Sequence, residues 1–359
     1  MSGTSTDGVD AVLARFDADG SPSILSSVSL PMPGVLRQEF LALNVPGPDE
    51  LARACIASNA LAELYAEACR AVLESAAVQP AAVNAIGAHG QTVRHAPDQG
   101  YTIQINAPAL LAERMGIAVI ADFRSRDVAA GGQGAPLVPA FHQALFSGDE
   151  ARAIVNLGGI ANVTVLGPEG QVKGFDTGPA NVLLDLWAQE HLGRNYDASG
   201  AWAATGRVEA GLLEFLVASE PWFALPPPKS TGRDLFNRNW LHSRLAAYQG
   251  RPLSHADIQA TLQALTACTV SRAIVSNAPD TRDVIVCGGG TLNASLMQAL
   301  QAALPWPVYP SSKFGVPVQM VEALAFAWLA WAHDQSRPAG LPAVTGARQP
   351  RVLGCRYPA

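Results

Sequence analysis

Cysteine is scarce in this sequence, which has five cysteines among 359 residues. None forms a Cys-x-x-Cys pair and their number is odd, which argues against a disulfide framework and a structural zinc site. The scattered thiols favour a reducing cytoplasm. Charged residues are also few, at 15%, and the formal net charge is −6. This acidic balance argues against a nucleic acid as the main partner, but a small anionic substrate remains compatible with it.

Long apolar runs are missing as well. The most apolar C-terminal run, residues 320–332, is interrupted by Glu322 and is too short to span a bilayer. The N-terminus is rich in Gly, Ser, Thr and Asp and shows no signal-peptide pattern. With 49% hydrophobic residues the chain can bury a large core, and its length fits two domains or one large α/β unit.

Short apolar segments alternate with helical patterns, which predicts α/β layers. The expected strands are residues 10–16, 83–87, 117–121, 153–155, 163–166 and 284–287. The expected helices are residues 49–77, 107–115, 136–146, 179–191, 256–276 and 293–303. A strand, a glycine turn and a second strand occur at residues 153–166, and the start of the chain follows the same plan if a strand precedes Met1. The repeat suggests a duplicated, two-domain fold.

The first glycine cluster opens the chain, where residues 1–10 read Met-Ser-Gly-Thr-Ser-Thr-Asp-Gly-Val-Asp. Glycines let a turn approach a ligand, backbone N–H groups bind phosphate, and carboxylates suit Mg²⁺. A hairpin turn uses the same residue types, so both interpretations stay open. As a phosphate loop, it would bind ATP through Gly3, Thr4, Ser5, Thr6, Asp7, Gly8, Val9 and Asp10, with Asp7 and Asp10 facing the metal ion.

Two further glycine clusters lie between predicted elements. Residues 156–162 read Asn-Leu-Gly-Gly-Ile-Ala-Asn, and residues 288–290 are three glycines between a strand and a helix. Neither is a Gly-x-Gly-x-x-Gly fingerprint or a Walker A loop. Each is either a tight structural turn or a site where phosphates approach the backbone. The nucleotide-binding candidates here are Asn156, Gly158, Gly159, Gly288, Gly289 and Gly290.

A single carboxylate stands out in residues 174–181, Gly-Phe-Asp-Thr-Gly-Pro-Ala-Asn. Pro179 suits the first position of a helix, so Asp176 is expected just before a helix N-terminus with free N–H groups and a positive dipole end. Asp176 is then either a helix cap or a general base beside a phosphate.

Three other segments carry polar side chains without a fixed interpretation. Arg124 either clamps an anion or forms a salt bridge with a nearby aspartate. His89 lies in a polar turn and is either structural or close to a substrate. Residues 226–239 are either a mobile lid or a solvated loop.

Taken together, these motifs resemble the anhydro-N-acetylmuramic acid kinase family over nearly the whole chain. The matching blocks are residues 1–10, 89–92, 122–139, 156–162, 175–179, 229–233, 287–290 and 322–326. The resemblance implies an α/β, two-domain actin-like fold (a duplicated ribonuclease H-like unit) with ATP in the interdomain cleft. It implies an N-terminal domain at 1–145 whose first strand would lie before Met1. The second domain is expected at 146–359, with its last segment packing back on the first.

The resemblance also implies the reaction. Family members open the 1,6-anhydro ring of anhydro-N-acetylmuramic acid and phosphorylate O6 with ATP and Mg²⁺, in peptidoglycan recycling. They are cytoplasmic and usually homodimers. By this resemblance Asp176 is the base that activates the attacking water, and His89, Arg124 and Glu322 contact the sugar. The family usually has Asp-Pro-Asp before the Glu322 helix, whereas residues 314–318 here read Phe-Gly-Val-Pro-Val.

Two alternatives remain at this stage. The glycine clusters fit another actin-like phosphotransferase or a plain ATPase equally well. An inactive protein that senses a sugar or a nucleotide is the non-enzyme alternative.

Overall fold

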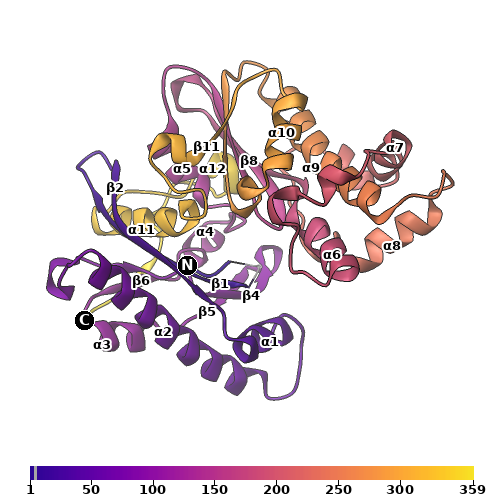
Figure 1. Cartoon of the computed structure of the whole chain (residues 1–359). Helices are drawn as coiled ribbons and strands as arrows, with labels where there is room; N and C mark the ends of the chain where they lie inside the picture. The colour runs from indigo at the N-terminus through magenta and orange to yellow at the C-terminus, as the bar shows by residue number, and fades with distance from the viewer. Residues whose placement is uncertain (4–5) are drawn as a thin grey trace. The chain divides into compact units, whose positions relative to one another are not determined.

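The computed structural model describes residues 1–3 and 6–359, so two predicted phosphate contacts, Thr4 and Ser5, lie outside the described residues. The chain is built of alternating helices and strands, which confirms the predicted α/β class (Figure 1). It divides into two compact units. Unit 1 comprises Met1–Phe146 and Met320–Ala359, and unit 2 comprises Ser147–Gln319. The sequence-based division placed one boundary after residue 145 and assigned residues 320–359 to the second domain.

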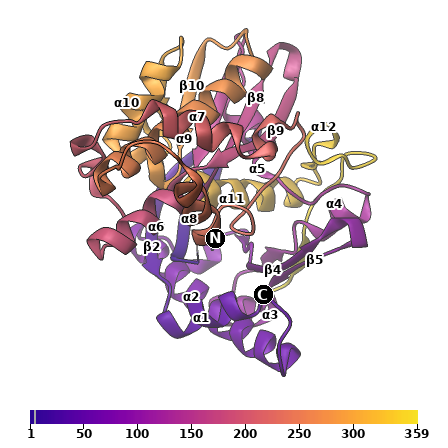
Figure 2. The same cartoon turned by 90° about the vertical axis from the view of Figure 1, so that its right-hand side faces the viewer.

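Unit 2 contains one five-stranded sheet with helices packed on it (Figure 2). Its strands are β7 (Arg152–Leu157), β8 (Ile160–Leu166), β9 (Val172–Pro179), β10 (Asp283–Cys287) and β11 (Val308–Pro310). Its helices are α6 (Asn181–Leu192), α7 (Ala210–Ala218), α8 (Arg238–Ala247), α9 (His255–Asn277) and α10 (Ala294–Ala303). Strands β7, β8 and β9 pair antiparallel, whereas β10 runs parallel to both β7 and β11.

The spatial order β9-β8-β7-β10-β11 is the ribonuclease H-like arrangement expected of one half of an actin-like fold. Strand β7 is the central strand of this sheet, and its residues Ala153, Ile154 and Val155 are completely buried. A strand buried on both faces needs a nearly continuous apolar run, and the sequence supplies it.

Within its described residues, unit 1 contains three smaller sheets. Its strands are β1 (Gly8–Phe16), β2 (Pro22–Pro31), β3 (Ile86–Gly87), β4 (Gln91–Ala96), β5 (Tyr101–Ile105), β6 (Val119–Ala121) and β12 (Cys355–Tyr357). Its helices are α1 (Gly34–Ala42), α2 (Glu50–Ser75), α3 (Pro108–Met115), α4 (Ser125–Ala129), α5 (Val138–Phe146), α11 (Val321–Asp334) and α12 (Pro342–Thr345). Antiparallel hairpins are formed by β1 with β2 and by β4 with β5, and β6 lies between parallel β3 and antiparallel β12.

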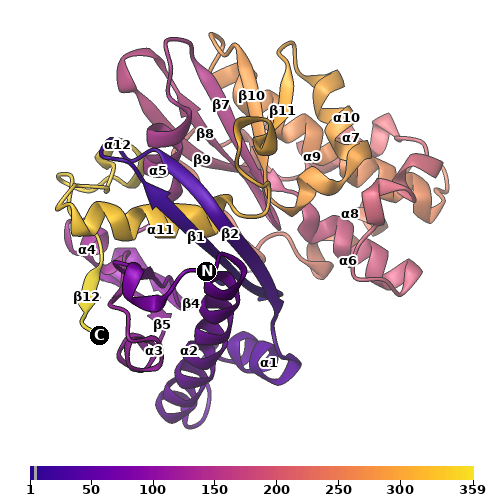
Figure 3. The same ribbon diagram turned by 60° about the vertical axis from the view of Figure 1, so that its left-hand side comes forward.

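Helices α2 and α11 both pack against β1 (Figure 3). The buried residues Leu61, Tyr65, Ala68 and Val72 recur at helical spacing along α2 and form its apolar stripe. Helix α11 is apolar around most of its circumference, which fits a helix buried within a unit. No helix in residues 1–3 and 6–359 combines the length and apolarity that crossing a membrane requires.

The predicted start of one helix is wrong. The sequence placed Pro179 at the first helical position, but Pro179 ends β9 and α6 begins at Asn181 after the N-cap Ala180. Asp176 therefore lies inside a strand, opposite Asn162, and does not cap a helix. Pairing with β8 outweighs the local helix signal, because a proline at a strand end loses no hydrogen bond that the ladder needs.

Candidate functional site

In unit 1 the segment 89–91 holds the start of the first glycine loop. Ser2 Oγ donates to the carbonyl of Gly90 at 3.1 Å, and Gln91 Nε2 donates to the carbonyl of Gly3 at 3.2 Å. Thr6 is buried and has a positive φ of 52°, which few side chains adopt. The loop is shorter than predicted, because β1 begins at Gly8 and the side chain of Val9 is in the core.

The predicted metal pair, Asp7 and Asp10, belongs to this region. Asp7 is exposed. The Asp10 carboxylate accepts a hydrogen bond from Ser29 Oγ at 2.5 Å, and burial raises the pKa of Asp10. Over the part of the chain that the structure describes, no group of three or more His, Cys, Asp or Glu side chains could hold a metal ion. Mg²⁺ commonly takes only one or two carboxylates beside phosphate oxygens, so Asp7 and Asp10 are chemically suited to it.

His89 and Arg124 meet inside unit 1. The guanidinium of Arg124 donates to His89 Nε2, with Nε at 3.1 Å, and to the carbonyl of Gly134 at 2.8 Å. His89 Nδ1 lies 2.7 Å from the carbonyl of Gly90, so this nitrogen carries the proton and Nε2 accepts. Burial and the Arg124 charge hold the pKa of His89 well below its usual value. The histidine is therefore neutral and positions the arginine.

Glu322 lies in the first turn of α11, and its negative charge acts on the guanidinium of Arg124. Burial lowers the pKa of Arg124 to about 10, while Glu322 and Asp127 oppose that shift. The three predicted substrate residues, His89, Arg124 and Glu322, thus belong to one charged cluster in unit 1. Of the two interpretations of Arg124, the exposed salt bridge is not what the structure shows, since its guanidinium is held by His89 and Gly134.

Asp127 is a residue of this region whose part the sequence did not reveal. It is buried, and its two carboxylate oxygens accept from the backbone N–H of Gly134 and from Thr345 Oγ1, both at 2.8 Å. Gly132 packs so closely that a Cβ there would overlap the same carboxylate. Asp127 therefore fixes the loop that carries the Gly134 carbonyl to Arg124.

In unit 2 the glycine turn between β7 and β8 supports the start of α6. The carbonyl of Gly159 accepts from the N–H groups of Ala180 and Val182 at 2.9 and 3.0 Å, and that of Gly158 accepts from Asn181 at 3.1 Å. The N–H groups of Ala180, Asn181 and Val182, at the helix start that the sequence offered to an anion, are thus satisfied by this turn. Gly158 and Gly159 have a structural role here, beside the predicted role in nucleotide binding.

The three glycines after β10 lie next to the same turn. Gly288 has φ 85° and ψ 169°, a conformation nearly restricted to glycine. A Cβ on Gly288 would overlap Asn156 Oδ1, and one on Gly290 would lie 2.6 Å from Leu157 Cβ. Gly289 is exposed, with Asn181 Nδ2 the nearest atom to such a Cβ at 4.0 Å. Asn156, Leu157 and the three glycines therefore pack against one another, and Gly289 is the exposed member of the group.

The side-chain hydrogen bonds that the structure gives to the Asp176 carboxylate both involve the same oxygen, Oδ2. Oδ2 accepts from the backbone N–H of Thr231 at 2.9 Å and from Ser230 Oγ at 3.1 Å. Burial raises the pKa of Asp176 to about 6, against the lowering effect of Thr231, Ser230 and Lys229. A carboxylate that ionises near pH 6 is a suitable general base at neutral pH.

The sequence identified the segment that holds Asp176 as a loop or lid and as one block of the family resemblance, but did not predict its contact with Asp176. The backbone N–H of Asp176 donates to the carbonyl of Lys229 at 3.0 Å. Lys229 Nζ donates to the carbonyl of Phe223 at 3.1 Å and lies 4.3 Å from the centre of the Trp222 ring. These contacts anchor residues 229–231 beside the strand that carries Asp176. The feature of the sequence that could have pointed to this contact was the Lys-Ser-Thr-Gly-Arg motif at residues 229–233.

Comparison with known proteins supplies the family. A family model described as anhydro-N-acetylmuramic acid kinase matches residues 1–359. A protein of that name from Bordetella parapertussis is 64% identical over 359 residues, which cover all of this chain and 95% of the relative. Proteins of the same name from Paraburkholderia xenovorans and Burkholderia orbicola are 54% and 52% identical, again over all of this chain and over 96% and 95% of the relatives. The chain belongs to the anhydro-N-acetylmuramic acid kinase family.

Proposed function

We propose that this kinase uses ATP to phosphorylate O6 of 1,6-anhydro-N-acetylmuramic acid while water opens the anhydro ring. The products are N-acetylmuramic acid 6-phosphate and ADP, as expected in peptidoglycan recycling. Membership of the family supports the substrate and the kinase activity. The observation that carries the mechanism is the single Asp176 carboxylate, with one oxygen held by residues 230 and 231 and a pKa of about 6.

In the proposed reaction Asp176 takes a proton from the water that attacks the anomeric carbon. The bond from that carbon to O6 breaks, and O6 forms a bond to the γ-phosphorus as ADP leaves. Departure of O6 towards phosphorus replaces the general acid that a glycosidase uses. Attack opposite the leaving oxygen inverts the anomeric centre.

The charged cluster in unit 1 is proposed to contact the sugar. Arg124 carries a positive charge that suits the lactyl carboxylate of muramic acid. His89 orients the guanidinium through its neutral Nε2, and Glu322 faces the same charge. An arginine held by two partners keeps its position without the substrate, which favours productive binding.

The glycine surfaces are proposed to contact ATP. In unit 2 these are Asn156, Gly158, Gly159 and residues 288–290, and in unit 1 they belong to the loop 3–10. Gly289 is exposed, and the nearest atom to a Cβ built on it lies 4.0 Å away, so its backbone is open to a phosphate, as a phosphate-binding surface requires. Asp7 and Asp10 would hold Mg²⁺, which would neutralise phosphate charge.

The cellular compartment and the oligomeric state of the protein remain predictions. The five cysteines are free in the described residues, which agrees with a reducing cytoplasm. A homodimer is expected only from the family resemblance. Sedimentation velocity of the purified protein measures the oligomeric state, and a monomer at micromolar concentration would contradict the dimer.

The activity is tested by incubating the protein with ATP, Mg²⁺ and the anhydro sugar. The mass of the product is then measured by mass spectrometry. We expect a sugar heavier by the mass of a phosphate group plus a water. ADP release with unchanged sugar would support a plain ATPase, and no change in either would support an inactive sensor.

The base assignment is tested by Asp176→Asn, with Asp280→Asn, an exposed position of the same unit, as control. We expect the Asp176 variant to lose at least ~10²-fold in turnover, the usual size of general-base effects. Nucleotide binding, measured by calorimetry, should stay close to that of the parent and of the control. Full turnover in Asp176→Asn would refute the assignment.

A further inference from the structure

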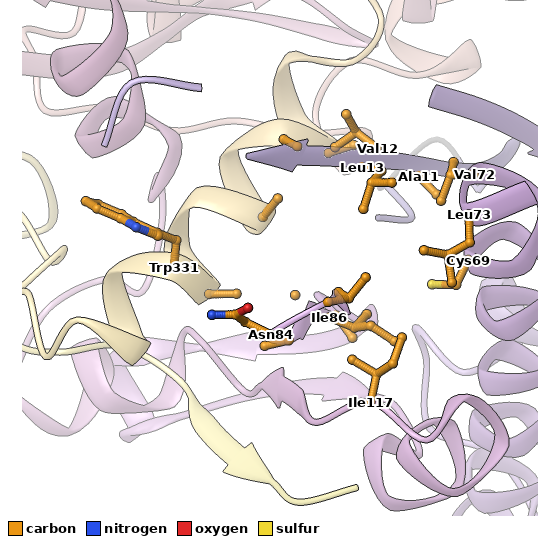
Figure 4. A pocket seen from close by; sticks show the side chains of 18 of the residues that line it. Ala11, Val12, Leu13, Cys69, Val72, Leu73, Asn84, Ile86, Ile117 and Trp331 are labelled. Carbon is orange, nitrogen blue, oxygen red and sulfur yellow. The ribbon is translucent and has the colours of Figure 1, made fainter. Parts of the chain in front are cut away.

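The proposed reaction needs a place where the attacking water is held by its two protons. Unit 1 contains a pocket of about 420 Å³, and Figure 4 shows Leu13, Ile86 and Trp331 among the side chains that line it. Most of the lining side chains are apolar and accept no hydrogen bond. In unit 2, by contrast, polar side chains collect at one level of a largely apolar sheet.

Three of these polar side chains lie next to one another on neighbouring strands. Asn162 of β8 pairs with Asp176 of β9 and, on its other side, with Asn156 of β7. Residues directly opposite each other in antiparallel strands project from the same face of the sheet. The adjacent pair, Val163 and Phe175, belongs to the apolar core of unit 2. Asp176 and the two asparagines therefore share the face opposite to that core.

Such a polar group is unusual within a sheet. Asparagine and aspartate are depleted in strands, because their side chains compete with the backbone for hydrogen bonds. Residues that break a local preference together are expected at functional sites. Asn156 is a predicted nucleotide contact and Asp176 is the proposed base, so Asn162 lies between the two positions and has neither role.

The pairing brings the side chains of Asn162 and Asp176 close together. The N–H of Asp176 points away from β8, because it donates to the carbonyl of Lys229 at 3.0 Å. Asp176 and Asn162 thus form a non-hydrogen-bonded pair, in which side chains approach closely and Cβ atoms are about 4.5–5.5 Å apart. Two oxygens that accept the two protons of one water, each at about 2.8 Å, are separated by about 4.5 Å. The spacing of the pair therefore fits one bridging water.

A β-bulge beside this pair sets the direction of Asp176. The register of β8 and β9 shifts between Ala161 and Asn162, so Thr177 has no residue opposite it. Thr177 Oγ1 donates to the carbonyl of Ala161 at 3.2 Å, which stabilises the bulge. Bulges are frequent next to active sites, where they redirect a side chain.

The atoms that a water needs are available on both side chains. The side-chain hydrogen bonds of Asp176 involve Oδ2, which leaves Oδ1 to a water. The Asn162 side chain is half-buried, and no hydrogen bond between the described residues engages its carboxamide. A carboxamide oxygen is a good acceptor for a water proton.

We propose that Asn162 is a further catalytic residue, whose Oδ1 accepts one proton of the attacking water while Asp176 Oδ1 accepts the other. This inference rests on the function proposed above. As the water oxygen bonds to the anomeric carbon, the proton towards Asp176 passes to that carboxylate, and the bond from the carbon to O6 breaks towards phosphorus. The proton towards Asn162 stays on the new hydroxyl group. With both protons engaged, the water directs a lone pair at the carbon, so Asn162 orients the nucleophile.

The test compares two substitutions of Asn162. Asn162→Ala removes the acceptor, whereas Asn162→Asp keeps an acceptor and adds a negative charge opposite Asp176. Asn239→Ala, at an exposed position of the same unit, is the control. For each variant kcat and KM for the sugar are measured as a function of pH, ATP binding is measured by calorimetry, and Tm reports folding.

We expect Asn162→Ala to lose about 10²-fold in kcat, the size of loss that a misplaced reacting group produces. Its KM for the sugar, its affinity for ATP and its Tm should stay close to those of the control. Asn162→Asp should recover part of the loss at high pH. Its acidic limb should move to higher pH, because a second carboxylate raises the pKa of Asp176 against the lowering effect of Lys229.

Two results would overturn the inference and leave the proposed base intact. One is turnover of Asn162→Ala equal to that of the control while Asp176→Asn is inactive. The other is an unshifted acidic limb in Asn162→Asp, since the two side chains would then not face each other. Full turnover in Asp176→Asn would instead remove the base, and the role of Asn162 with it.

Discussion

At the residue scale, Asp176 shows how surrounding groups set the pKa of a carboxyl group. Burial raises its pKa, whereas the two hydrogen bonds to Oδ2 and the charge of Lys229 restrain that increase. The balance gives a carboxyl group that loses its proton near pH 6. Because the sequence neighbours of Asp176 do not provide these contacts, only the fold brings residues 229–231 to it.

The pH dependence of the reaction follows from this balance. As the proposed base, Asp176 must be ionised, so kcat/KM should rise with pH to a plateau, with an apparent pKa of about 6. Ser230→Ala removes a hydrogen bond that lowers the pKa, so the acidic limb should move to higher pH while the plateau is largely kept. Ser312→Ala, at an exposed position of the same unit, is the control and should leave the limb in place. An unchanged limb in Ser230→Ala would contradict the role of this hydroxyl.

At the element scale, strand pairing decides whether a glycine-rich segment forms a strand, a turn or the start of a helix. Pairing with β8 carries β9 as far as Pro179, and the turn at Gly158 and Gly159 then receives the first N–H groups of α6. The sequence identified both segments as glycine turns or helix starts. It did not predict that one would support the other, because their contact joins residues about twenty positions apart through the sheet.

The turn after β10 allows a direct test of whether the backbone at Gly288 requires glycine. Gly288→Ala should cost about 1–3 kcal/mol of unfolding free energy, because its φ and ψ are nearly restricted to glycine and the new Cβ would lie 2.8 Å from the Leu157 carbonyl oxygen. Gly289→Ala is the matched control and should cost little, since its Cβ has open space. Urea unfolding measures both variants. Equal stability of the two would show that the backbone at Gly288 relaxes.

At the scale of the whole molecule, the chain leaves unit 1 after Phe146 and returns to it at Met320. The returning segment contributes α11, which packs on β1, β3 and α5, and β12, which pairs with β6. Leu324 and Phe326 of α11 are fully buried. Unit 1 therefore depends on both ends of the chain, whereas unit 2 is continuous.

A chain that ends at Gln319 tests this dependence. Loss of α11 and β12 exposes the apolar faces of β1 and β6, so we expect unit 1 to lose its protection from hydrogen exchange. Unit 2 has its own sheet and core and should keep its protection. Exchange followed by mass spectrometry reports both units in one sample. Full protection of the β6 segment in the shortened chain would contradict the expectation.

The sequence by itself determined the α/β class, the glycine turns and the family, and it predicted a role for Asp176, because these depend on local patterns and on the order of motifs. Tertiary structure alone decided that Asp176 lies in a strand held by residues 229–231 and that Arg124 is oriented by His89. The physical reason is the same in each case: the deciding hydrogen bonds and apolar contacts join residues far apart in the chain, and their energies outweigh the local preferences that a sequence displays.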